Sequence, residues 1–135
     1  MLFRSNRFIY LSLLFKLGCA APLGMENRTI SDAQITSSSQ LENRFSAAQA
    51  RLHSKADGNN QGGWVALKND LSQWLQVDLG TYTIVIRVAT QGRYGHDEWV
   101  TKYRLQYSED GYTFHFFEVS NGNSAKVHCM QVASC

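Results

Sequence analysis

The side chains that could carry out acid–base or metal chemistry are few and lie far apart in this sequence. The four histidines stand in separate segments: His53, His96, His115 and His128. Asp97 and Glu98 are adjacent, and on a strand they would point to opposite faces, which suits a general acid–base pair badly. The HExxH, GxSxG, P-loop and GxGxxG motifs do not occur. We therefore expect a protein that is not an enzyme.

The cysteines give no sign of a zinc site. Cys19, Cys129 and Cys135 form no CxxC pair, and no histidine lies at zinc-ligand spacing from them. Three cysteines allow one disulfide and leave one thiol over. In a secreted protein such an odd count is unusual.

Three short runs show the alternation of strands that bury one face. Apolar residues occupy every second position in residues 74–79, 84–88 and 101–107. Turn-forming residues separate the runs, at Gly80, at Gln91 and Gly92, and at Glu109, Asp110 and Gly111. Because the connections are too short for helical crossovers, we expect an antiparallel sheet.

Length and charge restrict the class of protein further. With 135 residues, of which 44% are apolar, the chain has the size and composition of one globular domain. Its formal charge of +2 includes Arg4, Arg7 and Lys16 of the N-terminal segment. Without them, ten basic and eleven acidic residues remain, for a net charge of −1. This balance does not indicate nucleic-acid binding.

The first 18 residues have the layout of a secretory signal peptide. Arg4 and Arg7 precede an apolar run at residues 8–17, which is too short to span a bilayer. Lys16 argues against this interpretation, and the alternatives are a lipoprotein signal ending at Cys19 or an incorrectly assigned first exon. We predict a secreted protein, in which the sequon at Asn27 is a candidate glycosylation site.

The strand region carries a resemblance to a known family. The segments QWLQVDLG, TQGR and WVTKYRLQYSEDG, which begin at residues 73, 90 and 99, resemble the discoidin domain, also called the coagulation factor V/VIII C-type domain. Matching pieces precede them in the family's order, at residues 19–26, 30–38, 50–52 and 63–64. The resemblance covers residues 19–123. It implies an all-β, jelly-roll-like antiparallel β-barrel or sandwich that binds ligands through loops at one pole and is not an enzyme.

Residues 124–135 match nothing further in the family, whose last strands are expected to be missing here. Without them, a sheet edge and part of one core face would be exposed. The resemblance also implies a disulfide from Cys19 to a terminal cysteine, for which Cys135 is the candidate and Cys129 the alternative. A truncated gene prediction, a partial sequence or a splice form would explain the short end.

Residues 40–52 allow two interpretations. Ser39 and Glu42 could form a capping box, and apolar residues recur at helical spacing after them, which predicts a helix. The family instead has an exposed loop with a short helical turn, leading into a strand at residues 50–52, and we favour this second interpretation. The three tryptophans, Trp64, Trp74 and Trp99, are expected to pack in or near the core.

The resemblance places two ligand-binding loops at one pole, at residues 41–45 and 93–98. The candidate contact residues are Leu41, Arg44, Phe45, Arg93, Tyr94, His96 and Asp97. Charged residues of the second loop are costly to bury in lipid, so we favour a cell-surface or matrix protein or glycan as partner. The alternatives are a peripheral phosphatidylserine-membrane binder and a truncated product without function. Arg93 could equally form a salt bridge within its loop, and Tyr94 could cap the barrel end.

No cofactor is expected, and calcium is the weaker alternative. Some relatives of this fold hold calcium through loop carbonyls and carboxylates. Here Asp32, Asp57 and Asp70 are scattered and do not form a spaced oxygen-ligand motif.

Overall fold

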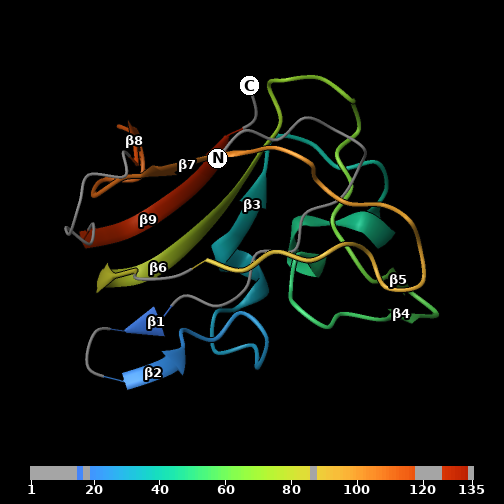
Figure 1. Cartoon of the computed structure of the whole chain (residues 1–135), viewed down its shortest axis with the longest axis horizontal. Coiled ribbons are helices and arrows are strands. Elements are labelled where there is room, and N and C mark those ends of the chain that lie inside the picture. The colour runs from blue at the N-terminus through green and yellow to red at the C-terminus, as the bar shows by residue number, and fades with distance from the viewer. Residues whose placement is uncertain (1–14, 17–18, 86–87, 118–125, 134–135) are drawn as a thin grey trace.

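The computed structural model describes residues 15–16, 19–85, 88–117 and 126–133, and these form an all-β structure (Figure 1). Its helices are three short 3₁₀ turns: η1 (Asp32–Gln34), η2 (Asn43–Phe45) and η3 (Ala47–Gln49). Its strands are β1 (Phe15–Lys16), β2 (Cys19–Pro22), β3 (Ile35–Ser37), β4 (Ala56–Asp57), β5 (Asn60–Gln61), β6 (Trp74–Ile84), β7 (Arg104–Tyr107), β8 (His115–Phe116) and β9 (Lys126–Ala133). None of the described helices has the length and hydropathy needed to cross a membrane.

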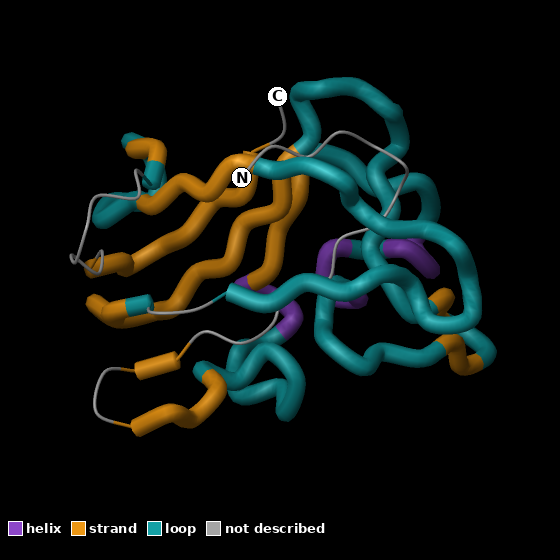
Figure 2. The backbone as a smooth tube through the Cα atoms, viewed as in Figure 1, coloured by secondary structure: helices purple, strands orange, loops and turns teal. Residues whose placement is uncertain are grey.

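The main sheet has five strands in the order β3-β6-β9-β7-β8, and each neighbouring pair is antiparallel. Figure 2 shows most strands on the left of the molecule and the long loops on the right. Ile35 of β3 pairs with Val77 of β6. Leu105 of β7 pairs with Val132 of β9. The remaining strands form two small antiparallel pairs, β1 with β2 and β4 with β5. The all-β fold and the antiparallel pairing predicted from the sequence are confirmed.

Strand β6 follows its sequence pattern. Leu75 and Val77 have no exposed surface, whereas Gln76 is half-buried and Asp78 is exposed. The buried side chains join a core that includes Ile35 and Trp64 together with Met25, Ile30, Ala47, Ala50 and Val85. Burial of each large apolar side chain contributes about 1.5–3 kcal/mol, so this face holds the sheet against the loops that cover it.

The predicted end of a strand at Gly80 is wrong. Strand β6 continues through Gly80 to Ile84, and its register with β9 shifts between Asp78 and Thr83. Gly80 has a φ of +70°, a conformation that glycine adopts without steric cost. The glycine therefore marks an irregularity of the β-bulge type within one long strand. The separate strand predicted at residues 84–88 includes residues 86–87, which lie outside the described residues.

The C-terminal segment differs from what the sequence led us to expect. Residues 126–133 form β9, whose backbone lies between β6 and β7. Val77 of β6 pairs with Met130, and Arg104 of β7 pairs with Ala133. Residues 124–135 were expected to match nothing further in the family, but residues 126–133 pair with both β6 and β7.

Residues 40–52 form no long helix, so the loop interpretation is the better one. The structure has only η2 and η3 here, and the strand expected at residues 50–52 does not form. Ala50 and Arg51 are nevertheless buried, at 0% and 3% exposed. The segment thus covers the core as an irregular loop, and its polar groups bond both within the segment and to Met25, Asp32 and Val65.

The tryptophans differ in their surroundings. Trp64 is 2% exposed, and its indole N–H donates to the carbonyl oxygen of Ser39 at 2.8 Å. Trp74 is half-buried, as expected. Trp99 is 52% exposed, so the prediction that it packs as the start of a strand is wrong. The reason is that β7 begins only at Arg104, and the chain before it is a loop.

Candidate binding surface at the loop end of the sheet

The predicted contact residues lie at one end of the sheet. Strand β3 ends there, and Ser38 donates its backbone N–H to the carbonyl oxygen of Trp74, the first residue of β6. Three segments lie beyond this end: residues 41–45, residues 55–61 with the β4–β5 hairpin, and residues 93–98. We call them together the loop cluster. Figure 1 shows the β4–β5 hairpin and η2 on the right, away from β8 on the left.

Arg93 links all three segments of the loop cluster. Its Nε donates to the carbonyl oxygen of Gln61 at 2.7 Å, and its Nη2 donates to the Gln61 side-chain oxygen at 3.1 Å. Its Nη1 donates to Oε2 of Glu98 at 3.0 Å. The guanidinium carbon lies 5.3 Å from the centre of the Phe45 ring, within cation–π range. Only 9% of the Arg93 side chain is exposed.

The sequence left two roles open for Arg93: a contact with the ligand, or a salt bridge within its loop. The contacts just described distinguish between them. A side chain that is mostly buried and bonded to two neighbouring segments supports the loops more than it offers donors to a ligand. Phe45, which covers the guanidinium, is itself half-buried. The geometry therefore favours the interpretation in which Arg93 stabilises the loop cluster from within.

The 41–45 segment presents a mixed surface. Leu41 is 37% exposed, and its backbone N–H donates to the carbonyl oxygen of Val65 at 2.8 Å. Arg44 forms an exposed ion pair with Glu42, at 2.9 Å between Nη2 and Oε2. Exposed ion pairs contribute little to stability, so Arg44 can exchange Glu42 for a partner at low cost.

The tip of the 93–98 segment carries the most exposed of the predicted contact residues. Tyr94 is 58% exposed, and the Lys55 ammonium lies 5.1 Å from the centre of its ring. His96 and Asp97 are both exposed. Gly95 has a φ of +73° at this turn, and the His96 backbone N–H donates to the carbonyl oxygen of Arg93 at 3.2 Å. The turn thus presents an aromatic ring beside polar and charged groups.

Sequence reasoning missed Lys55, Gln61 and Trp99 as members of this surface. The exposed Trp99 borders a hollow of about 220 Å³ lined also by Thr90, Gln91, Gly92 and Val100. A Cβ atom on Gly92 would lie 3.0 Å from the carbonyl oxygen of Glu98 and 3.3 Å from Cβ of Trp99. Gln91 and Gly92 were interpreted only as a turn signal, although the missing side chain of Gly92 is what leaves room for Glu98 and Trp99 on the other side of the loop.

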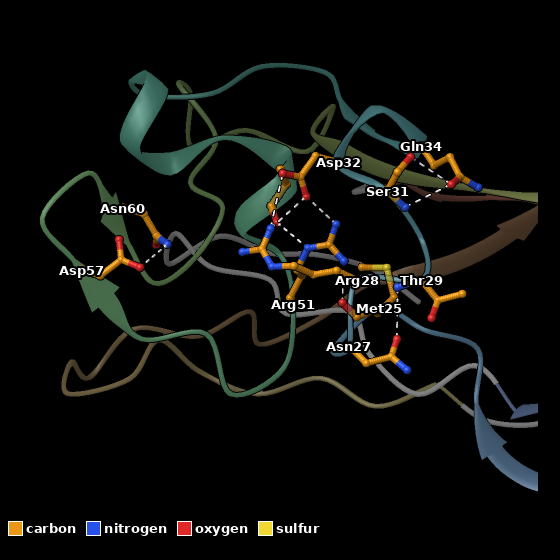
Figure 3. Close-up of polar contacts among 11 residues, drawn as sticks. Met25, Asn27, Arg28, Thr29, Ser31, Asp32, Gln34, Arg51, Asp57 and Asn60 are labelled. Atoms are coloured by element: carbon orange, nitrogen blue, oxygen red, sulfur yellow. Dashed lines mark hydrogen bonds and ion pairs between the residues drawn. The ribbon is translucent and has the colours of Figure 1, made fainter.

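A polar cluster around the buried Arg51 supports the covering loops (Figure 3). Nη1 of Arg51 donates to the carbonyl oxygen of Met25, and its Nη2 donates to Oδ1 of Asp32, each at 2.5 Å. Arg28 pairs with the same Asp32 from the exposed side at 3.4 Å. Arg51 thereby ties residues 25–32 to the segment that follows η3. Asn27, the candidate glycosylation site, is exposed, and its Oδ1 accepts from the Thr29 backbone N–H at 3.1 Å.

The described residues give no indication of a metal site, and the side chains of the predicted disulfide lie outside them. Within them, no three His, Cys, Asp or Glu side chains gather closely enough to hold a metal ion. Asp70 instead accepts from the Gln73 side-chain amide and the Ser72 backbone N–H, and these bonds lower the pKa of its carboxyl. Of the predicted disulfide pair, Cys135 lies outside the described residues, and only the backbone of Cys19 is described.

An antiparallel sheet that holds long loops at one end is typical of all-β domains whose loops carry the functional residues. The sequence matches the F5/8 type C domain family over residues 34–131. The chain belongs to this family, and the resemblance stated above is confirmed. The match reaches residue 131, so it includes most of β9. It indicates a family of binding domains and no enzyme family.

Several curated proteins are similar to the chain. Lactadherin of Rattus norvegicus is 39% identical over 106 residues, which cover 75% of this chain and 25% of that protein. Retinoschisin of Takifugu rubripes is 45% identical over 93 residues, covering 66% and 32% respectively. The human EGF-like repeat and discoidin I-like domain-containing protein 3 is 41% identical over 102 residues, covering 70% and 21%. The chain thus spans between about a fifth and a third of the length of these relatives.

Proposed function

We propose that the chain is an extracellular adhesion or recognition module that binds a cell-surface or matrix protein or glycan through the loop cluster. The observation that carries this proposal is the position of Arg93. It joins the three loop segments from within, while Tyr94, His96 and Asp97 remain exposed at the tip. A supported scaffold with an exposed aromatic and polar surface is typical of recognition sites.

Support of the loops from within also favours affinity. Ordering a mobile loop on binding costs free energy, and a loop that is already held by hydrogen bonds avoids much of that cost. Tyr94 adds contact area with few rotatable bonds, and its hydroxyl group can bond to polar groups of a partner. Lys55 beside the ring supplies a positive charge to the same surface.

The phosphatidylserine alternative requires apolar loop tips that enter the lipid. Of the two apolar candidates in the first segment, Phe45 is half-buried against Arg93, and Leu41 is 37% exposed. The tip of the second segment carries the exposed Asp97 beside His96. Burying a charged group in hydrocarbon costs about 2.5–3.5 kcal/mol on insertion scales, which favours a protein or glycan partner.

The extracellular setting follows from the predicted signal peptide in residues 1–18 and from the sequon at Asn27. Residues 1–14 and 17–18 lie outside the described residues. Detection of the chain in the culture medium of expressing animal cells would support this part of the proposal, and retention in the cytosol would contradict it.

The loop cluster is tested by binding to arrays of matrix proteins and glycans, compared with vesicles with and without phosphatidylserine. Tyr94→Ala should weaken array binding by about tenfold, as expected for a central aromatic contact. Tyr112→Ala is the matched control, because Tyr112 is 91% exposed and follows β7 near β8, away from the loop cluster. Vesicle binding that depends on phosphatidylserine and survives high salt would overturn the proposal, as would equal binding by both variants.

A further inference from the structure

The chain contains two Asp-Gly pairs, Asp57-Gly58 and Asp110-Gly111, and the structure holds them very differently. In such a pair the backbone nitrogen of the glycine can attack the side-chain carbon Cγ of the aspartate, because glycine has no Cβ atom to hinder the approach. A C–N bond forms, the C–OH bond of the protonated carboxyl breaks, and one water molecule leaves. The product is a five-membered cyclic imide.

The hydrogen bonds around Asp110-Gly111 disfavour this ring closure. Oδ1 of Asp110 accepts from the Ser108 hydroxyl at 2.9 Å. The same oxygen accepts from the backbone N–H groups of Tyr112 and Thr113, at 2.8 and 2.7 Å. These bonds, that from Thr113 above all, hold the pKa of the Asp110 carboxyl well below its usual range and keep it in the ionised, unreactive form. The attacking nitrogen is tied as well, because the Gly111 N–H donates to the Ser108 hydroxyl oxygen at 2.8 Å.

Asp57-Gly58 lacks these restraints. Asp57 ends β4, Gly58 opens the turn to β5, and both residues are exposed. Among the described residues, the Asp57 carboxylate accepts a single hydrogen bond, from Nδ2 of Asn60 at the long distance of 3.4 Å (Figure 3). The Gly58 N–H makes no hydrogen bond with the described residues, and a Cβ atom on Gly58 would meet nothing within 4 Å. Both reacting groups are therefore accessible.

We propose that Asp57 is a site of spontaneous isomerisation to isoaspartate through a cyclic imide formed with the backbone nitrogen of Gly58. Water is the only other reactant, and no atom changes its oxidation state. When water cleaves the bond between the Gly58 nitrogen and Cγ, aspartate is restored. When it cleaves the bond between that nitrogen and the former main-chain carbonyl carbon of Asp57, the main chain runs through Cγ and is longer by one carbon atom.

The extra carbon atom lies in the hairpin that supports Arg93. Two residue pairs hold the β4–β5 hairpin together, Ala56 with Gln61 and Asp57 with Asn60. A longer turn disturbs the register of both pairs. Gln61 accepts from the Arg93 guanidinium through its carbonyl and side-chain oxygens, at 2.7 and 3.1 Å. Isomerisation therefore loosens the loop cluster from within as the protein ages, whichever partner the loop cluster binds.

The test is incubation of the folded full chain at pH 5 and 37 °C in water enriched in oxygen-18. Each opening of the imide leaves one labelled oxygen atom in the aspartate or isoaspartate. Mass spectrometry of peptide fragments then assigns the label to Asp57 or Asp110. Since Asp110 must first release at least one hydrogen bond of its charged group, we expect Asp57 to take up the label at least about tenfold faster.

Two controls separate the effect of the fold from that of the sequence. In guanidinium chloride the two Asp-Gly pairs should take up the label at similar rates, because neither is held. Gly58→Ala should slow labelling of Asp57 severalfold and leave that of Asp110 unchanged, and its thermal midpoint checks that the variant is folded. Equal labelling of the two aspartates in the folded chain would overturn the proposal, as would the same unequal ratio in the denatured chain.

Hydrogen exchange of the backbone amides measures the consequence for the loop cluster. In protein aged until Asp57 has isomerised, residues 56–61 should exchange severalfold faster than in fresh protein. Residues 108–113, which contain the other Asp-Gly pair, should exchange as before. Unchanged exchange at residues 56–61 would overturn the inferred loosening of the loop cluster.

Discussion

Replacing Arg93 with methionine should destabilise the domain far more than the same change at an exposed arginine. Methionine keeps much of the length of the side chain but removes the charge and every hydrogen-bond donor. The bonds lost are those to the carbonyl and side-chain oxygens of Gln61 and to Oε2 of Glu98. The cation–π contact with Phe45 is lost as well.

The size of the expected loss in the free energy of unfolding follows from the burial of the Arg93 side chain. Removing one partner of a buried ion pair costs about 3–5 kcal/mol, and each hydrogen bond to a charged group contributes about 1.5–3 kcal/mol. The Arg93 side chain is 9% exposed, but Glu98 is 32% exposed and can be rehydrated. We therefore expect the free energy of unfolding to fall by about 2–4 kcal/mol, out of the roughly 5–15 kcal/mol that is usual for a domain. The thermal midpoint should fall by roughly 10 °C.

Equilibrium urea unfolding measures this loss, and Arg44→Met is the matched control. Arg44 pairs with Glu42 at 2.9 Å, but both side chains are more than half exposed, so the control should lose about 0.2–1 kcal/mol. A double-mutant cycle with Glu98→Gln isolates the ion pair from the bonds to Gln61. If Arg93→Met costs no more than Arg44→Met, the role assigned to Arg93 is refuted.

Three further predictions concern the sheet and its turns. Leu75→Ala should lower the free energy of unfolding by about 2–5 kcal/mol in urea titrations, because Leu75 has no exposed surface, and a loss below 1 kcal/mol would contradict the core. Asp110→Asn should destabilise the protein at pH 6 but much less at pH 2.5. The folded pKa of Asp110 is lowered, so its contribution is present above the unfolded pKa of about 3.9 and is lost as the pH falls toward the folded value. A difference between the two proteins that grows on acidification would contradict this sign. Deleting residues 126–135 should abolish a cooperative thermal transition, because β6 and β7 both pair with β9, and unchanged unfolding would show that β9 is dispensable.

The part of the fold that was predicted from the sequence is the part with local periodicity. In β6, one face is buried and the other is not, so Leu75 and Val77 alternate with polar residues in the printed sequence. Gly80 shows the limit of this approach. A positive φ occurs both at turns and at bulges, so a lone glycine cannot distinguish the end of a strand from an irregularity within it.

Strand β9 was not foreseen because strand pairing is not local. Residues 126–133 pair with residues of β6 that lie 42–59 positions earlier and with residues of β7 that lie 27–29 positions earlier. The spacing of residues within residues 126–133 does not indicate which strands they pair with. The family match to residue 131 does contain this information, because it aligns the segment as part of the domain.

The candidate binding surface was located through the family resemblance, but only part of its support was foreseen. The salt bridge of Arg93 within its loop, to Glu98, was one of the two roles left open for this residue. The 41–45 and 93–98 segments lie together as the resemblance implied. Another partner of Arg93 is Gln61, which is 32 positions away and contributes a backbone carbonyl that no side-chain motif encodes. Trp99 was misjudged because the sequence does not show that β7 begins only at Arg104, which leaves the exposed Trp99 in a loop.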